Sequence, residues 1–137
     1  MVLRIHDIPG THTKDGYFAG HATAGSDKEE ALFRAPFACT VTAVEWTPSS
    51  NVTGDDTNYF TLTIYNRTTG AGSTVVAQLA FVTGVNATAN TPKTITLSGT
   101  AANLNLAADD VITASKVHTA SGLACPTGSV RVSFKAR

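Results

Sequence analysis

The sequence is poor in charged residues, in cysteine and in long apolar runs. Only 15% of its 137 residues are charged, and ten Lys and Arg balance ten Asp and Glu, so the formal net charge is zero. Proteins that bind duplex nucleic acid normally present a basic face, so nucleic acid is not expected as a partner. No stretch approaches the roughly 20 apolar residues of a membrane-spanning helix, so no membrane is expected either.

The first ten residues contain no apolar run long enough for a secretory signal peptide. We therefore expect a soluble protein that is made in the cytoplasm. The chain has two cysteines, Cys39 and Cys125. A disulfide between them would tie an early strand to the loop before the last strand, but disulfides are rare in the cytoplasm. A buried Cys39 and an unpaired loop thiol at Cys125 are the favoured interpretation.

Two segments in which side chains alternate with a period of two organise the chain. In the first, residues 39–46, one face carries Cys39, Val41 and Ala43, and the other carries Thr40, Thr42 and Val44. In the second, residues 58–66, one face carries Phe60, Leu62 and Ile64, and the other carries Tyr59, Thr61, Thr63 and Tyr65. This period predicts two β-strands, each of which buries one face.

Short alternating segments continue to the C-terminus, separated by turns rich in Gly, Pro, Asn and Asp. They cover residues 31–34, 73–81, 93–97, 104–106, 111–118 and 129–135. About seven or eight strands at this spacing, with no convincing helix, predict an all-β fold. We expect a single antiparallel β-sandwich of the jelly-roll or immunoglobulin-like kind.

Residues 1–30 differ from the rest, because their apolar residues are sparse and follow no period. Such a segment cannot bury enough surface to fold alone. We predict an extended N-terminal arm over residues 1–30 and a sandwich domain over residues 31–137. The arm either becomes ordered against a partner or packs as a tail on its own domain. Its hydrophobic anchors would be Ile8, Tyr17 and Phe18.

The patterns that usually mark a metal site are incomplete. Three histidines lie in the glycine-rich N-terminal segment without the ligand spacing of a zinc site: His6, His12 and His21. Two aspartate pairs lie in loops without the alternating spacing that wraps a calcium ion, and turns are favoured for both: Asp55-Asp56 and Asp109-Asp110. No metal and no other cofactor is expected.

Catalytic patterns are no stronger. Cys125 follows His118 by seven residues, but no third group to orient them is evident. Glu45, in the middle of a strand, has no partner carboxylate that would suggest glycosidase chemistry, and an exposed strand residue is favoured. We therefore expect that the protein is not an enzyme.

Three aromatic residues suggest an alternative role in carbohydrate binding: Trp46, Tyr59 and Tyr65. If at least two of them were exposed on one face, they could form a platform for sugar rings. The competing interpretation places Trp46 in the core or at its rim, as is common for a lone tryptophan.

Several segments together resemble small β-sandwich proteins encoded with the structural genes of tailed bacteriophages. They are FRAPF at 33–37, TVTAV at 40–44, VTGDDTNY at 52–59, LTIYN at 62–66, VAQLAF at 76–81 and LNLAADDV at 104–111. The resemblance covers about residues 32–135 and consists of strand and turn patterns. Residues 1–30 match nothing in it.

The resemblance implies a capsid decoration (cement) protein that sits on the outside of the phage head and bridges shell subunits. The implied partner is the major capsid protein, the implied location is the virion surface, and a homotrimer or other homo-oligomer is expected. On this interpretation we predict that the arm anchors Ile8, Tyr17 and Phe18, with Phe33 at the rim of the sandwich, make the contacts. The alternative is a carbohydrate-binding module on a virion or bacterial surface.

Overall fold

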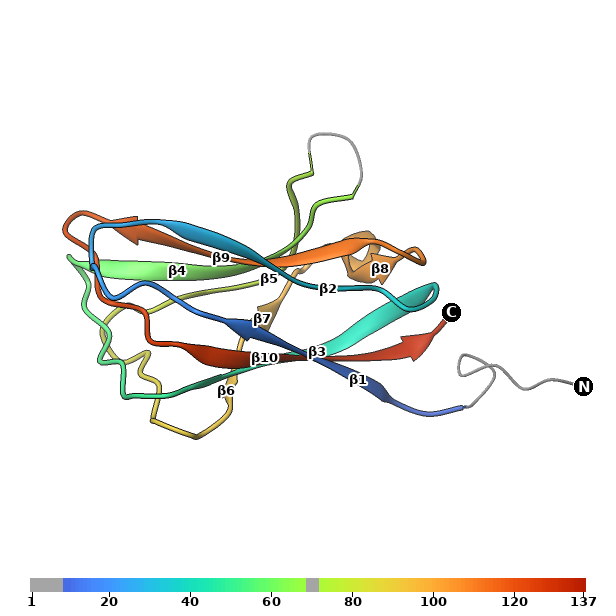
Figure 1. Cartoon of the computed structure of the whole chain (residues 1–137), viewed down its shortest axis with the longest axis horizontal. Helices are drawn as coiled ribbons and strands as arrows, with labels where there is room; N and C mark the ends of the chain where they lie inside the picture. Colours follow the sequence, from blue (N-terminus) through green and yellow to red (C-terminus); the bar gives the residue numbers. More distant parts are fainter. Residues whose placement is uncertain (1–8, 69–71) are drawn as a thin grey trace, which may run out of the picture.

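The computed structural model describes residues 9–68 and 72–137, and it confirms the predicted all-β sandwich. Two antiparallel sheets pack face to face (Figure 1). The first sheet contains β1 (His12–Phe18), β10 (Gly128–Ala136), β3 (Cys39–Pro48), β6 (Lys93–Thr94) and β8 (Asn105–Leu106). The second contains β2 (Lys28–Arg34), β9 (Val111–Thr119), β4 (Tyr59–Asn66), β5 (Thr74–Ala80) and β7 (Thr96–Leu97).

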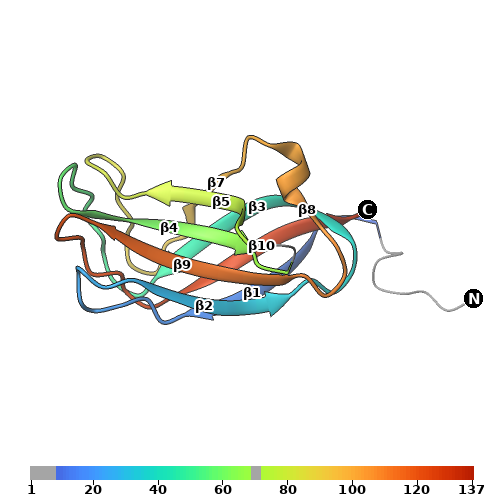
Figure 2. The ribbon, with the colours of Figure 1, turned by 90° about the horizontal axis from the view of Figure 1, so that it is seen from above.

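Ten strands are found in the described residues, where seven or eight were expected. The surplus has two sources: β1 lies in the segment predicted to be an arm, and the strand predicted over residues 93–97 is divided into β6, which pairs with β3 in the first sheet, and β7, which pairs with β5 in the second. A 3₁₀ turn, η2 (Ala101–Leu104), precedes β8. The strand orders are β1-β10-β3-β6, with β8 also paired to β3, and β2-β9-β4-β5-β7 (Figure 2).

The alternation predicted for β4 is confirmed. Phe60, Leu62 and Ile64 are fully buried between the sheets. The ring of Phe60 packs against Phe81 with centroids 4.7 Å apart, and both rings contact Trp46 at 6.2 and 5.5 Å. This aromatic cluster forms the centre of the core, where burial of apolar surface supplies most of the folding free energy.

The alternation predicted for β3 is correct only for its first half. Val41 pairs with Phe134, but the next residue pair is Ala43 with Ser133, so Thr42 is an extra, bulged residue. A β-bulge of this kind moves every later side chain to the opposite face. Val44 is therefore buried and Ala43 only partly so, contrary to the prediction.

The N-terminal segment is part of the sandwich, so the predicted boundary between residues 30 and 31 is wrong. Strand β1 pairs with β10 along its whole length, and β2 pairs with β9. Residues 12–18 are held by a strand more than 100 residues away, which a reading of local hydrophobicity cannot detect. Residues 1–8, the start of the predicted arm, lie outside the described part of the chain.

Strands β1 and β2 are edge strands of different sheets and lie against each other, which closes one side of the sandwich (Figures 1 and 2). Their backbones approach closely at Gly16, where an added Cβ would lie 2.6 Å from the Cβ of Leu32. A glycine permits this approach because it has no side chain to collide.

The two ends of the sandwich differ. The β1–β2, β3–β4 and β9–β10 connections meet at one end, which we call the loop end (Figure 1). The C-terminus and the start of β1 lie at the other, which we call the terminus end. Strand β1 runs toward the loop end, whereas β2 and β10 run back toward the terminus end.

Candidate functional site

The four predicted contact residues do not form one exposed set. Tyr17 is 66% exposed, but its neighbour Phe18 is fully buried in the core. Successive side chains of a strand point to opposite faces, so Tyr17 and Phe18 of β1 cannot both be exposed anchors. The prediction for Phe18 is therefore wrong. Phe33 is partly buried against the core, and Ile8 lies outside the described residues.

Tyr17 stands on the outer face of the first sheet, beside a charged pair. Arg131 of β10 lies opposite Asp15 and donates hydrogen bonds to both of its carboxylate oxygens, at 2.8 and 3.2 Å. These hydrogen bonds lower the pKa of Asp15. On the other side of β10, Glu45 of β3 lies opposite Arg131 in the strand register. The exposed tyrosine therefore lies beside a row of three charged side chains, Asp15, Arg131 and Glu45, on three adjacent strands.

The three residues of the alternative sugar platform do not form one exposed set. Trp46 is fully buried, because the bulge at Thr42 turns it into the core. The ring of Tyr65 is covered by the guanidinium of Arg67, whose Cζ lies 3.9 Å from the ring centroid. Tyr59 and Tyr65 are both partly exposed on the outer face of β4, so these two rings are the part of the predicted platform that reaches the surface.

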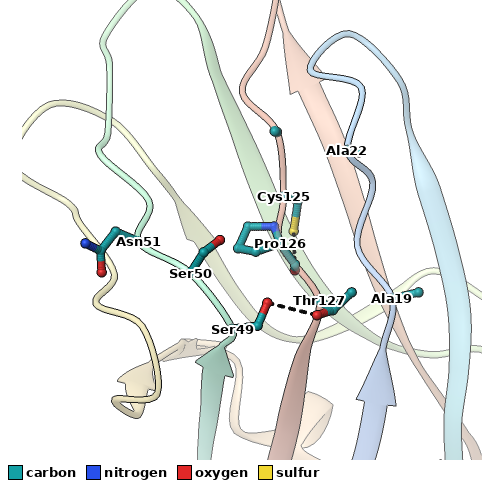
Figure 3. A pocket seen from close by; sticks show the side chains of 9 residues that line it. Ala19, Ala22, Ser49, Ser50, Asn51, Cys125, Pro126 and Thr127 are labelled. Atoms are coloured by element: carbon teal, nitrogen blue, oxygen red, sulfur yellow. Dashed lines mark hydrogen bonds between the residues drawn. The ribbon is translucent and has the colours of Figure 1, made fainter.

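A cleft of about 400 Å³ opens at the loop end (Figure 3). Its walls are Ala19, Ala22, Ser49, Ser50, Asn51, Ala124, Cys125, Pro126 and Thr127. The hydroxyl groups of Ser49 and Thr127 point toward each other and lie 2.9 Å apart. Because none of the lining side chains is charged at neutral pH, the cleft offers hydroxyl and amide groups and methyl groups to a neutral molecule.

Both cysteines are free and buried, which confirms the unpaired interpretation. Cys125 is not an exposed loop thiol, however, because its backbone pairs with His21 and its side chain faces inward. Burial raises the pKa of Cys125 to about 12 and that of Cys39 to about 11. Both thiols therefore stay protonated at neutral pH, and neither offers an activated nucleophile.

A buried lysine is the feature that sequence reasoning missed. Lys116 of β9 is fully buried. It lies on the same inward face of the strand as Ile112 and Ala114. Its ammonium group donates to the backbone carbonyl oxygens of Ser26, Ala24 and Thr23 at 2.5, 2.6 and 3.3 Å. Burial lowers the pKa of Lys116. The only sequence signal was a lysine at an inward position of an otherwise apolar strand face.

The same β1–β2 loop is held by a second polar contact. Asp27 accepts hydrogen bonds from the backbone N–H of His118 at 2.8 Å and lies 2.6 Å from its Nδ1. These contacts lower the pKa of Asp27. The loop is therefore fixed over the loop end by Lys116 on the inside and by Asp27 at the surface.

The aspartate pairs are turn residues. Asp55 accepts hydrogen bonds from the backbone N–H groups of Thr57 and Asn58, and buried Asp110 accepts one from the side chain of Asn66. Over residues 9–68 and 72–137, no group of three or more His, Cys, Asp or Glu side chains could hold a metal ion. In the same residues, no helix is long and apolar enough to cross a membrane.

No protein-family model matches this chain, and no curated protein matches it in sequence. Among solved structures, the chain is similar to a chain in the structure of infectious bursal disease virus Gx strain, with a TM-score of 0.42 and 16% sequence identity. The match covers 96% of this chain but only 33% of that one, so this chain spans about a third of its length.

Proposed function

We propose that this chain is a structural, non-enzymatic protein of a phage particle, which binds the outside of the capsid and bridges shell subunits. The observation that carries the proposal is Tyr17, which is 66% exposed on the outer face of β1. Tyrosine is enriched at the residues that dominate binding energy in protein interfaces, because its rigid ring buries a large area at a small entropic cost. The strand and turn patterns that resemble phage decoration proteins support the same role.

The sandwich suits such a role mechanically. The sheet edges are short, irregular or covered, which protects them against nonspecific pairing: β6 and β7 are two residues long, β2 contains a register shift at Leu32, and β1 lies against β2. A partner is therefore expected to bind to a sheet face rather than to extend a sheet. A protein that binds the assembled shell and not its free subunits stabilises the shell by mass action.

The first experiment measures whether the chain is part of a particle. Particles from the native source are washed and pelleted, and this chain is quantified by mass spectrometry relative to the major shell protein. A constant ratio in washed particles is expected. If the chain is absent from particles, the proposed function is wrong.

The contact residue is tested with a matched pair of variants. Tyr17→Ser is expected to weaken attachment to particles that lack this chain by about tenfold or more, as for an interface hot spot. Tyr59→Ser, which removes a partly exposed ring from the second sheet, is the control and should bind normally. Equal attachment of both variants would show that the face around Tyr17 is not the contact surface.

A further inference from the structure

Charge is unevenly distributed over this neutral chain. Four exposed basic side chains belong to the half of the sandwich at the terminus end: Lys14, Arg34, Lys135 and Arg137. Among the described residues two exposed acids lie near them: Asp15, which follows Lys14 and is paired with Arg131, and Asp109, whose carboxylate lies 4.0 Å from Arg34 with both side chains largely in solvent. Ion pairs this exposed and this long contribute little.

These four residues lie on three neighbouring strands. Gly16 of β1 lies against Leu32 of β2, and the two strands run in opposite directions, so Lys14 and Arg34 are level with each other. Strand β10, which carries Lys135 and leads to Arg137, is the hydrogen-bonded neighbour of β1. The backbone N–H of Arg137 donates to the carbonyl oxygen of Ala38 at 3.1 Å, which holds this residue at the terminus end. We call the four residues the basic corner.

Three residues of the basic corner have no ion-pair partner in the described part of the chain. Among the described residues, no carboxylate lies within ion-pair distance of Lys14, Lys135 or Arg137. Outside the corner, Arg131 is paired with Asp15, Arg67 with Glu29 and Lys28 with Glu30, whereas Lys93 is a single lysine without a carboxylate at this distance in the described part of the chain. Positive charge is thus left unneutralised at one place on the surface.

The loop end carries three exposed aspartates. Asp27, Asp55 and Asp56 are exposed there, and the carboxylates of Asp55 and Asp56 accept hydrogen bonds from backbone N–H groups rather than from Lys or Arg. A chain with zero net charge and this separation has one end that attracts negative surfaces and one that repels them.

We propose that the basic corner binds an acidic protein surface and that the loop end points away from that partner. This inference rests on the proposed function, in which the partner surface belongs to the capsid shell. Charges of this kind steer the encounter and set the orientation of binding more than they add affinity. Tyr17 lies three residues after Lys14, so its side chain points to the opposite face of β1 and lies nearer the loop end, and the inference about the basic corner does not depend on Tyr17.

Protein is favoured over nucleic acid as the partner. The acidic loop end would repel a polyanion that extends beyond the corner, and a nucleic-acid site normally needs a longer basic track. An acidic patch on a protein is compact enough to meet the corner without approaching Asp27, Asp55 or Asp56.

The test compares two double variants with the same change in net charge. Lys135→Glu with Arg137→Glu reverses half of the basic corner, and Lys28→Glu with Lys93→Glu, the control, reverses two lysines on other parts of the surface. Thermal melting first establishes that both variants fold. Binding to washed particles that lack this chain is then measured at low and at physiological salt, together with binding to a duplex DNA fragment.

The corner variant is expected to lose about tenfold or more in binding to particles at low salt, and the control variant about twofold or less. Wild-type binding should weaken as salt is added. If wild type binds particles and the corner variant binds equally well, the inference is wrong while the proposed function stands. If wild type does not bind particles at any salt, the proposed function itself fails. Salt-sensitive DNA binding that the corner variant loses, with unchanged particle binding, would assign the corner to nucleic acid instead and overturn the inference.

Discussion

The ammonium group of Lys116 lies 2.6 Å from the carbonyl oxygen of Ala24 and has two further carbonyl partners in the same loop. A buried lysine normally lies beside a carboxylate, because an isolated charge in the interior is costly. Here three backbone carbonyl groups solvate the ammonium group instead of a carboxylate. The negative charge of Asp27 also favours the protonated form of Lys116. The lysine therefore joins β9 to the β1–β2 loop, which forms one wall of the loop-end cleft.

Replacing Lys116 with Met should release this loop. Three partly buried carbonyl oxygens would lose their donor, so the free energy of unfolding should fall by about 1–3 kcal/mol. Hydrogen exchange of the amides in residues 23–27 should also become faster. The control is Lys93→Met, since Lys93 is only partly buried and has none of these contacts. Equal stability and unchanged exchange for both variants would mean that Lys116 does not hold the loop.

A methyl group at Gly16 tests whether β1 belongs to the sandwich. In Gly16→Ala the new Cβ would lie 2.6 Å from the Cβ of Leu32, so β1 or β2 must shift. Overpacking of this kind should lower the free energy of unfolding by about 1–3 kcal/mol. Gly99→Ala is the matched control, because nothing lies within 4 Å of an added Cβ there. If residues 12–18 were a detached arm, denaturant melts of the two variants would coincide.

Both thiols should be unreactive in the folded protein. Cys39 and Cys125 are buried, and their pKa values are raised to about 11 and about 12, so almost no thiolate is present at neutral pH. A thiol-specific reagent should modify neither cysteine under native conditions and both in denaturant. Rapid labelling of Cys125 in the native protein would show that the 124–127 loop opens.

Stability should fall in acid. The pKa values of Asp15 and Glu29 are lowered, chiefly by hydrogen bonds from Arg131 and Arg67. A carboxyl group whose pKa is lower in the folded state stabilises the fold fully above its unfolded pKa, and this contribution is lost as the pH falls through the folded value. The melting temperature should therefore stay level from neutral pH to about pH 5 and decrease below about pH 4.

The contribution of Glu29 to the loss of stability in acid can be measured with Glu29→Gln, which removes this carboxyl group. This variant should lose less stability between neutral and acidic pH than wild type does, when both are followed by thermal melting. Glu45→Gln is the comparison, since the carboxylate of Glu45 makes no hydrogen bond or ion pair with the described residues. An identical pH profile for Glu29→Gln and wild type would contradict the role of the Glu29–Arg67 pair.

The sequence by itself determined the fold class and the faces of β4. Phe60, Leu62 and Ile64 alternate with polar residues, and a strand with that period has only one face that can be buried. The turn role of Asp55 could also be predicted, because its side chain bonds backbone amides two and three residues further along the chain. Both are local properties, and local properties are readable from neighbouring residues.

Only the tertiary structure decided where Trp46, Phe18 and Lys116 lie. Trp46 is buried because an extra residue at Thr42 shifts the register of β3 against β10, and a register exists only between two strands. Phe18 became a core residue because residues 12–18 pair with β10 at the other end of the chain. Lys116 could be buried because a loop some 90 residues earlier supplies its carbonyl partners. Each outcome depends on contacts between distant segments, which no local pattern of side chains contains.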